Sequence, residues 1–295
     1  MLKIVKEHFS SISEMMNVLD KRPNNEIMKH CDSSSRKGDR DWYGTSSYEE
    51  ASQLMRTGYT EILPKIKEGL AKSSIVVSKM FSPTDLRRPK NLPVGFIPHI
   101  PNSILNLPNS MIDIKISPQK RKTLSILYVM AGHCGNTKEM WIKAGIALLT
   151  AIKIVERQGI SISIDTVFYC GSEHEQTAMG SVRVKHFGQP LDIQKLCFPL
   201  ANPSMFRRIG FKFLETTPVI TDESFAYGYG RGFDCDEKKI KSQLEDDKTY
   251  VLSGQWISKH DYKVESILEY LNFSKNESGA TKSERKERRK QKGEV

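Results

Sequence analysis

The segment LSILYVMAGHCGNTKEMWIKAGIALLTAIKIVERQGISISIDTVFYCG, residues 124–171, decides the fold class. It begins with a short apolar run, Leu124 to Met130, and a turn of small residues follows this run. An apolar-rich segment of helical length then extends from Thr137 to Gln158, and a second β-like run covers Ile160 to Cys170. Two β-like runs joined by one long helix are typical of a parallel sheet. The sequence therefore predicts an α/β protein with a Rossmann-type central sheet flanked by helices.

The composition divides the chain into four regions. We expect residues 1–82 to form a helical region and residues 120–273 to form the α/β domain, because the apolar spacing suits these elements. Residues 83–119 contain seven prolines, which exclude a long helix and a central strand, so an extended wrap is predicted there. Residues 274–295 have the composition of a disordered basic tail.

The proline-rich wrap contains apolar side chains that argue against full exposure. These residues are Phe96, Ile97, Ile100, Ile104, Leu105, Leu107 and Met111. A flexible linker is the alternative, but linkers of that kind are polar. We therefore expect the wrap to pack across the α/β domain that follows it.

Helix start signals are clear in the N-terminal region. A first helix is expected over residues 11–20, ahead of Pro23. Ser46 or Ser47 is placed to cap a second helix, with an acidic residue three positions further on as the capping-box partner. The sequence thus predicts two short helices and a polar loop in the first 58 residues, and no strand.

Shorter elements are expected after the strand–helix–strand unit. Val182 and Val184 alternate with charged residues, so 181–187 is predicted to be a half-exposed strand, either an edge strand or the hairpin partner of 160–170. A helix is expected over 203–215, and strands are expected at 219–220 and 250–252.

Arg207 and Arg208, with Lys212 one turn later, make one face of the predicted helix basic. A run of charge on a helix is usually the solvated side of that helix. We therefore expect these three side chains to face solvent.

The chain of 295 residues has a net charge of +10, which favours contact with anionic partners, nucleic acid in particular. The alternative is a solvated basic surface with a basic tail. The tail concentrates cations between residues 282 and 292, and these residues lack aromatic companions. Its candidate contacts to phosphate are Arg285, Arg288, Arg289 and Lys290.

A loop rich in tyrosine and glycine is the second candidate for nucleic-acid binding. The sequence YGYGRGF interleaves aromatic residues, an arginine and glycines, a combination that suits stacking on bases. Its candidate binding residues are Tyr227, Tyr229, Arg231 and Phe233. An ordinary surface loop has the same composition, so both interpretations stay open.

Cysteine usage and hydropathy indicate the compartment. The five cysteines are dispersed and form no CxxC pair, which suits a reducing cytoplasm. The N-terminus has no apolar core of signal-peptide length. No uninterrupted apolar stretch reaches about 18 residues, so no membrane span is expected.

The turn at residues 131–136, after the first strand, is where an α/β fold of this kind would hold a phosphate or a metal ion. Gly132 and Gly135 alone do not make a phosphate loop. The turn has no carboxylate for a hard cation, and Asn136-Thr137 is explained as a helix cap. A soft metal would need Cys170 and His174 in addition to His133 and Cys134, and no other Cys/His spacing supports such a site. We therefore expect no metal and no cofactor.

A catalytic pair at the same turn is a further alternative. Cys134 lies at the start of the predicted helix, where the helix dipole lowers the pKa of a thiol. His174 would serve as the base, with Asp165 or Glu173 orienting it. A buried cysteine is an ordinary core residue, which favours the non-catalytic interpretation.

The order of strand, small-residue turn, long helix and two hairpin-like strands resembles the opening of a von Willebrand factor A-like (VWA-like) domain. That family ends its first strand with a D-x-S-x-S metal-binding motif. In this chain Ala131 stands at the Asp position and His133 and Gly135 at the Ser positions, or, in the other register, Met130, Gly132 and Cys134. The resemblance implies a VWA-like fold with a degenerate metal-ion-dependent adhesion motif.

Two other segments are similar to a family of uncharacterised tailed-bacteriophage proteins. DWYGTSSYEEA, residues 41–51, resembles its W-x-G-T/S-x-x-x-E-A signature, and FPLANPSMFRR, residues 198–208, resembles its C-terminal part. The resemblance covers most of residues 25–260. It implies a phage origin and the cytoplasm of the bacterial host, and it carries no assigned activity.

From these features the expected function is that of a non-enzymatic binding or scaffold protein that acts on host or phage macromolecules. A protein partner is expected first, and no membrane partner is expected. The alternatives are a nucleic-acid-binding protein that uses the tail and the Tyr/Gly/Arg loop, and an enzyme with the Cys134–His174 pair. The sequence leaves the oligomeric state open.

Overall fold

The computed structural model describes most of the chain, and every structural statement below concerns the described residues. These are residues 3–26, 39–80, 90–95, 97–113, 123–132, 135–171, 176–221, 240 and 249–272. The predicted tail at 274–295 lies outside these ranges.

The strand–helix–strand unit is present where the sequence predicts it. Strand β5 (Thr123–Val129) pairs in parallel with β6 (Ser161–Gly171), and helix α6 (Lys138–Arg157) connects them. Thr137 caps α6, because its side chain accepts a hydrogen bond from the backbone N–H of Met140. Leu149 and Ile152 of α6 are fully buried.

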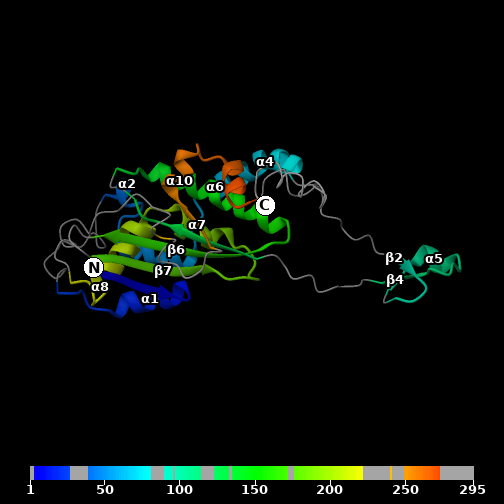
Figure 1. Ribbon diagram of the computed structural model, residues 1–295, viewed down its shortest axis with the longest axis horizontal. Helices are drawn as coiled ribbons and strands as arrows, with labels where there is room; N and C mark the ends of the chain where they lie inside the picture. Colours follow the sequence, from blue (N-terminus) through cyan, green and yellow to red (C-terminus); the bar gives the residue numbers. More distant parts are fainter. Residues whose placement is uncertain are drawn as a thin grey trace, which may run out of the picture.

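Three more strands complete a mostly parallel central sheet of order β1-β7-β6-β5-β8 (Figure 1). β7 (Gln176–Lys185) is the antiparallel hairpin partner of β6, as expected, and β8 (Thr249–Ser253) lies parallel to β5. β1 (Lys3–Phe9) pairs in parallel with the other side of β7. The prediction of a purely helical N-terminal region was therefore wrong, and β7 is a largely buried inner strand and not a half-exposed edge strand.

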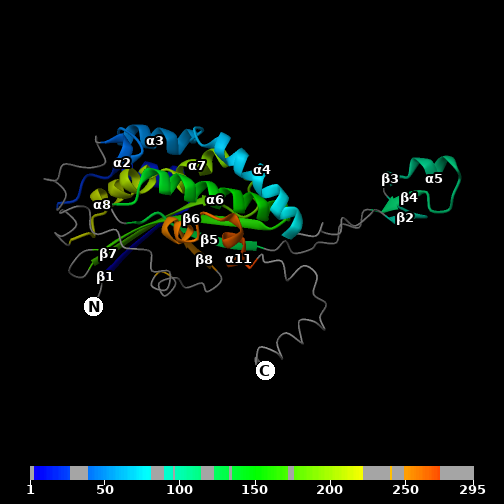
Figure 2. The same ribbon diagram turned by 90° about the horizontal axis from the view of Figure 1, so that it is seen from above.

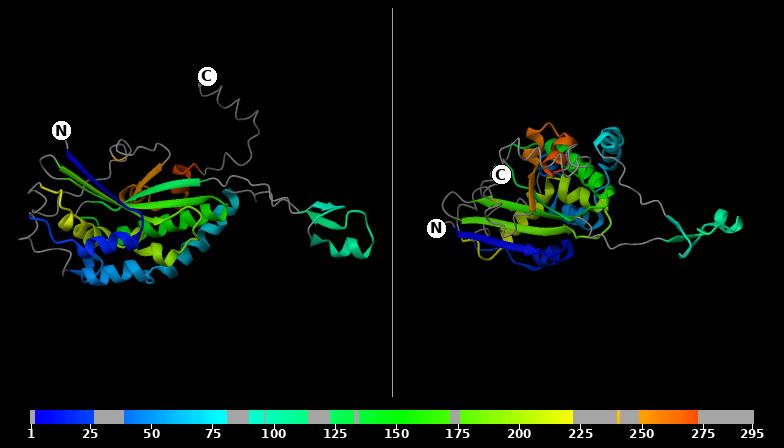
Figure 3. Two further views of the ribbon diagram at one scale, coloured as in Figure 1. Left: turned by 90° about the horizontal axis from the view of Figure 1, so that it is seen from below. Right: turned by 45° about the vertical axis from the view of Figure 1, so that its right-hand side comes forward.

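Most helices form one layer over one face of this sheet (Figures 2 and 3). α1 (Ile12–Lys21) and α3 (Tyr48–Thr57) begin at the caps Ser11 and Ser47, and α4 (Leu63–Met80) and α7 (Ile193–Ala201) pack with α6. The segment predicted as a helix over 203–215 consists of a π-helical stretch, η1 (Met205–Gly210), and α8 (Phe211–Thr216).

Two short helices follow the last strand of the central sheet. α10 (Gly254–Lys259) and α11 (Val264–Tyr270) follow β8 and pack against α6. The strand expected at Val219–Ile220 is absent from this described segment, which is a turn with Val219 half exposed.

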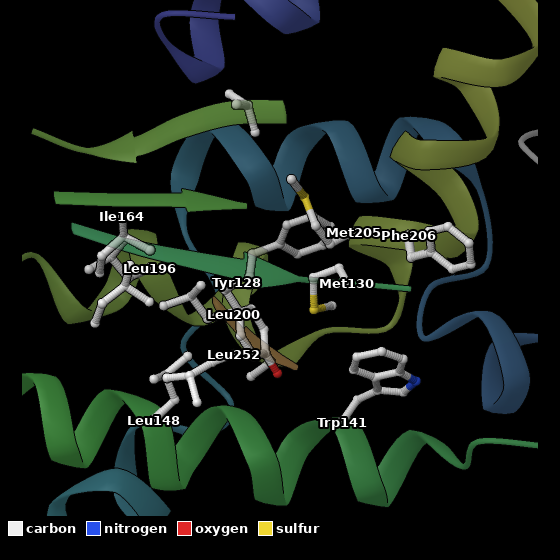
Figure 4. Packing of buried hydrophobic residues seen from close by; sticks show 14 of the residues in the cluster. Tyr128, Met130, Trp141, Leu148, Ile164, Leu196, Leu200, Met205, Phe206 and Leu252 are labelled. Carbon is white, nitrogen blue, oxygen red and sulfur yellow. The ribbon is translucent and has the colours of Figure 1, made fainter. Parts of the chain in front are cut away.

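The main apolar core fills the space between the sheet and the helix layer (Figure 4). Tyr128 of β5, Met130 directly after it, Trp141 and Leu148 of α6, and Leu200 of α7 meet there. A smaller apolar cluster, which includes Leu127, Val129 and Val251, lies on the opposite face of the sheet. A sheet with apolar residues on both faces agrees with the near-continuous apolar runs of its strands.

Residues 90–113 form a separate small unit, and the prediction of an extended wrap packed across the domain was wrong. β2 (Lys90–Leu92), β4 (Met111–Asp113) and β3 (Ile97–Pro98) form an antiparallel sheet of order β2-β4-β3, beside α5 (Ile100–Ile104). This unit lies apart from the central sheet in all views (Figures 1 and 2). Short strands and one helical turn tolerate the prolines, because Pro98 lies at a strand end and Pro101 lies in the first turn of α5.

Candidate functional site

Most of the predicted site residues lie outside the described residues. These are Cys134, His174, Tyr227, Tyr229, Arg231, Phe233, Arg285, Arg288, Arg289 and Lys290. The catalytic and nucleic-acid hypotheses that rest on them therefore stay predictions.

Two further candidates from the sequence are described: Asp165 from the catalytic alternative and Cys170 from the soft-metal alternative. Asp165, the proposed orienting carboxylate, forms a two-pronged ion pair with Arg183 across the β6–β7 hairpin, in which Nη2 donates to Oδ2 at 3.0 Å. The Asp165 carboxylate thus pairs with an arginine of the neighbouring strand. Cys170 is buried in β6, and burial raises the pKa of its thiol, so this cysteine behaves as a core residue.

Three buried polar atoms lie near the carboxyl end of β5. Trp141 Nε1, Asn136 Nδ2 and Tyr128 Oη are inaccessible to solvent and have no hydrogen-bond partner among the described residues. A Cβ atom added to Gly132 would lie 2.3 Å from Asn136 Nδ2 and 3.1 Å from Trp141 Cζ2, so these groups surround the turn closely. Figure 4 shows the Trp141 indole and the Tyr128 ring on the same side of β5.

These three atoms favour an acceptor, and they disfavour a cation. The indole and amide nitrogens only donate hydrogen bonds. Burial raises the pKa of Tyr128, so its hydroxyl keeps its proton. Among the described residues, no group of three or more His, Cys, Asp or Glu side chains is placed to hold a metal ion. The described unpaired groups at this turn therefore provide hydrogen-bond donors.

Residues 41–45 and 202–208 meet beside this turn. Arg207 of η1 lies over the indole of Trp42 in α2 (Arg40–Tyr43), with Cζ 3.9 Å from the ring centroid. Its Nη1 donates to the Trp42 carbonyl at 2.5 Å, and its Nη2 donates to the Asn136 carbonyl at 2.7 Å. One guanidinium thus joins α2, η1 and the turn that precedes α6.

Arg208 makes a parallel arrangement one residue further on. Its Cζ lies 3.8 Å from the centroid of the Tyr43 ring, and its Nη2 donates to the Thr45 carbonyl at 3.0 Å. Both arginines are buried, at 3% and 0% exposure, so the prediction that this basic face is solvated was wrong. Burial lowers the pKa of Arg208, and the nearby Tyr43, Glu49 and Glu50 oppose this shift.

Gly44 and Ser204 complete the contact between the two segments. Gly44 adopts a φ of 92°, which favours glycine, and an added Cβ would lie 2.4 Å from Asn202 Oδ1 and 2.8 Å from Pro203 Cγ. Ser204 Oγ donates to the Tyr43 carbonyl at 2.6 Å and lies 2.9 Å from Thr45 Oγ1. The residues of both motifs are thus explained by their contacts with each other.

The small unit of residues 90–113 carries the most exposed apolar surface among the described residues. We name its large exposed side chains the apolar knob. They are Val94, Ile97, Ile100, Ile104, Leu105 and Leu107. Val94 is 80% exposed and Ile104 is 78% exposed, and elsewhere in the described ranges only Phe187 and Val219 are large, apolar and comparably open.

The knob is nearly free of charge in a strongly basic chain. Between residues 90 and 113 only Lys90 and Asp113 are formally charged, and His99 is the one other titratable group. The sequence signal was present, because apolar residues without an amphipathic period fill this segment. These apolar residues predict burial against the α/β domain, whereas the side chains of the knob are exposed in the structure.

Comparison with known proteins identifies one family. A family model described as "Domain of unknown function (DUF7192)" matches residues 2–275, which is most of the chain. No curated protein and no solved structure matches the chain. The match includes the central sheet, the helix layer and the knob. It also includes the contacts of Arg207 with Trp42 and of Arg208 with Tyr43, which we name the arginine–aromatic junction. The chain therefore belongs to the DUF7192 family.

Proposed function

We propose that this protein is a non-enzymatic binding or scaffold protein that docks a protein partner through its apolar knob. The single observation that carries the proposal is the exposure of the six knob side chains on a unit that lies apart from the central sheet (Figure 2). Exposed apolar patches of this kind mark interaction sites in proteins that are otherwise well packed. The knob has almost no cations, so it is unsuited to phosphate groups.

The sequence around the knob suggests the chemistry of its partner. In the sequence, Arg87 and Arg88 come shortly before the unit, which begins at Lys90. We propose that the partner offers an apolar groove bordered by carboxylates. An apolar contact surrounded by complementary charge is the usual anatomy of a specific protein interface.

The remaining parts of the proposal concern the fold and its setting. We propose a VWA-like fold, which is supported by the parallel β5–α6–β6 unit and the antiparallel β6–β7 hairpin. We propose a phage origin and action in the bacterial host cytoplasm, on the resemblance of residues 41–51 and 198–208 to tailed-bacteriophage proteins. None of the helices in the described ranges is long and apolar enough to cross a membrane.

Affinity capture from infected cells tests the proposed function. Tagged wild-type protein and an Ile100→Ser/Ile104→Ser/Leu105→Ser variant are compared, each with and without nuclease. The matched control is Phe187→Ser/Val219→Ser, which alters exposed apolar residues outside the knob. A specific protein that survives nuclease, is lost with the knob variant and is retained by the control supports the proposal. Its purified form must then bind the wild type directly.

Two outcomes would contradict the proposal. Capture that nuclease abolishes for all three proteins would support the nucleic-acid alternative. Knob-dependent binding to anionic lipid vesicles without any bound protein would make the knob a membrane anchor.

A further inference from the structure

A cavity of about 680 Å³ opens at the surface, and no residue of the turn at 131–136 lines it. The starts of α1 and α7, the end of α3 and the end of β7 surround it. This volume lies within the range of about 300–1,000 Å³ that is typical of small-molecule sites. All of its lining residues lie in the described ranges, and no motif in the sequence indicated it.

One part of the lining is apolar. Met55 and Leu196 are buried side chains that reach the cavity, and Ile12 and Val184 are half buried there. These side chains belong to four different elements of the fold, so the apolar surface exists only in the assembled tertiary structure. It suits a ring or a short aliphatic portion of a ligand.

The charged part of the lining is mainly basic. Arg56, Arg183, Lys185 and Lys195 line the cavity, and Asp192 is the one carboxylate in the lining. Three of these cations are held by carboxylates that do not line the cavity: Arg56 by Asp20 at 2.8 Å, Lys185 by Glu156 at 2.7 Å, and Arg183 by Asp165.

These ion pairs fix the cations in position without using all of their donors. Arg56 reaches Asp20 through Nη2, and Arg183 reaches Asp165 through Nε and Nη2. A guanidinium has five N–H donors, so each arginine retains donors for a second acceptor. Lys195 lies 3.8 Å from Asp192, beyond hydrogen-bond distance, and its side chain is well exposed.

The starts of α1 and α7 border the cavity, and their first turns contribute Ser13 and Lys195 to the lining. Each start already has a carboxylate: Glu14 lies in the first turn of α1, and Asp192 is the N-cap of α7, where its Oδ1 accepts a hydrogen bond from the backbone N–H of Lys195. The attraction for an anion therefore depends on the side-chain cations.

We propose that this cavity binds a small phosphorylated molecule of about mononucleotide size, with its phosphate near Arg56 and Lys195 and its apolar portion on Ile12 and Val184. Arg56 and Lys195 would bind the phosphate. The apolar lining favours a ligand with a ring over inorganic phosphate. The site is distinct from the knob, so its test does not depend on the proposed docking function.

Calorimetric titration of the full-length protein with AMP tests this proposal, with inorganic phosphate as the second probe. We expect AMP to bind with a millimolar or lower dissociation constant and inorganic phosphate to bind at least about tenfold more weakly. An Arg56→Gln/Lys195→Gln variant should weaken AMP binding by at least about tenfold, because exposed charge-assisted contacts to the phosphate are lost. The matched control, Lys67→Gln/Lys143→Gln, removes two exposed cations elsewhere on the helices and should bind AMP as the wild type does.

A second variant protects the test against misfolding. Ser13→Glu places a carboxylate at the mouth of the cavity, at an exposed position in the first turn of α1, where an acidic residue is favourable for the helix. It should retain the melting temperature and lose AMP binding. The proposal is overturned if AMP does not bind the wild type at 5 mM, if phosphate binds as tightly as AMP, or if Ser13→Glu folds and binds AMP normally. Equal weakening in the Lys67/Lys143 control would also overturn it, because binding would then follow net charge alone.

Discussion

The guanidinium of Arg207 stacks on the indole of Trp42, with Cζ 3.9 Å from the ring centroid, although 165 residues separate them in the chain. The same side chain donates hydrogen bonds to the carbonyls of Trp42 and Asn136. It thereby connects the helix layer to the turn that follows the carboxyl end of β5. The junction is a structural element of the fold, and it accounts for the pairing of two distant sequence motifs.

Replacing Arg207 with Met should destabilise the fold by about 2–4 kcal/mol. Two buried carbonyls would lose charge-assisted hydrogen bonds, and a desolvated cation–π contact would also be lost. Urea unfolding followed by circular dichroism measures the change. Lys143→Met, an exposed position on α6, is the control and should change stability little. A loss for Arg207→Met no larger than that of the control would mean that the junction is energetically neutral.

Gly44→Ala should cost about 2–5 kcal/mol, since the new Cβ adds a clash with Asn202 and Pro203 to the strain of a left-handed backbone. Gly159→Ala is the matched control, because Gly159 has a φ of 77° and open space around it. That substitution should cost only the backbone strain, about 1–2 kcal/mol. Equal losses of unfolding free energy at the two positions would show that Asn202 and Pro203 move aside at little cost.

Leu149→Ala should cost about 2–5 kcal/mol, because Leu149 is fully buried between α6 and its neighbours. Ile146 on the same helix is only half buried beside the core, so Ile146→Ala should cost less. Chemical denaturation of both variants provides the comparison. The reverse order of the two losses would place the core on a different face of α6.

Divalent cations should leave the melting temperature unchanged. The turn at 131–136 lacks a carboxylate, and the described groups around it are hydrogen-bond donors. Thermal melts in EDTA and then in excess Mg²⁺ or Zn²⁺ check this expectation. A rise of several degrees with either metal would reveal a site that this chemistry does not provide.

Any nucleic-acid binding should be electrostatic and independent of sequence, since the tail has cations without groups that read bases. Truncation after Asn276 should remove most of the affinity and reduce its salt dependence. A Tyr227→Ala/Tyr229→Ala variant tests the alternative route, in which aromatic stacking contributes about 1–3 kcal/mol per base on single strands. Fluorescence anisotropy with single- and double-stranded probes at two salt concentrations separates the two. Absence of binding to either probe at low salt would remove the nucleic-acid hypothesis.

Local signals in the sequence determined the central unit and the helix starts. The apolar runs at β5 and β6 and the long helix between them lie where the pattern predicts, because each is specified by neighbouring residues. Ser11, Ser47 and Thr137 cap their helices for the same reason, since a cap needs only the three residues that follow it.

Only the tertiary structure decided which chemical groups are buried and which are exposed. Arg207 and Arg208 read as a solvated face, yet aromatic rings and carbonyls from residues 42–45 cover them. The strand at residues 3–9 forms by pairing with β7, which is about 170 residues away in the chain. The apolar residues of 94–107 read as buried, and they are exposed because the small unit lies apart from the sheet. Each of these outcomes depends on contacts between distant segments, and such contacts have no periodic signature in the sequence.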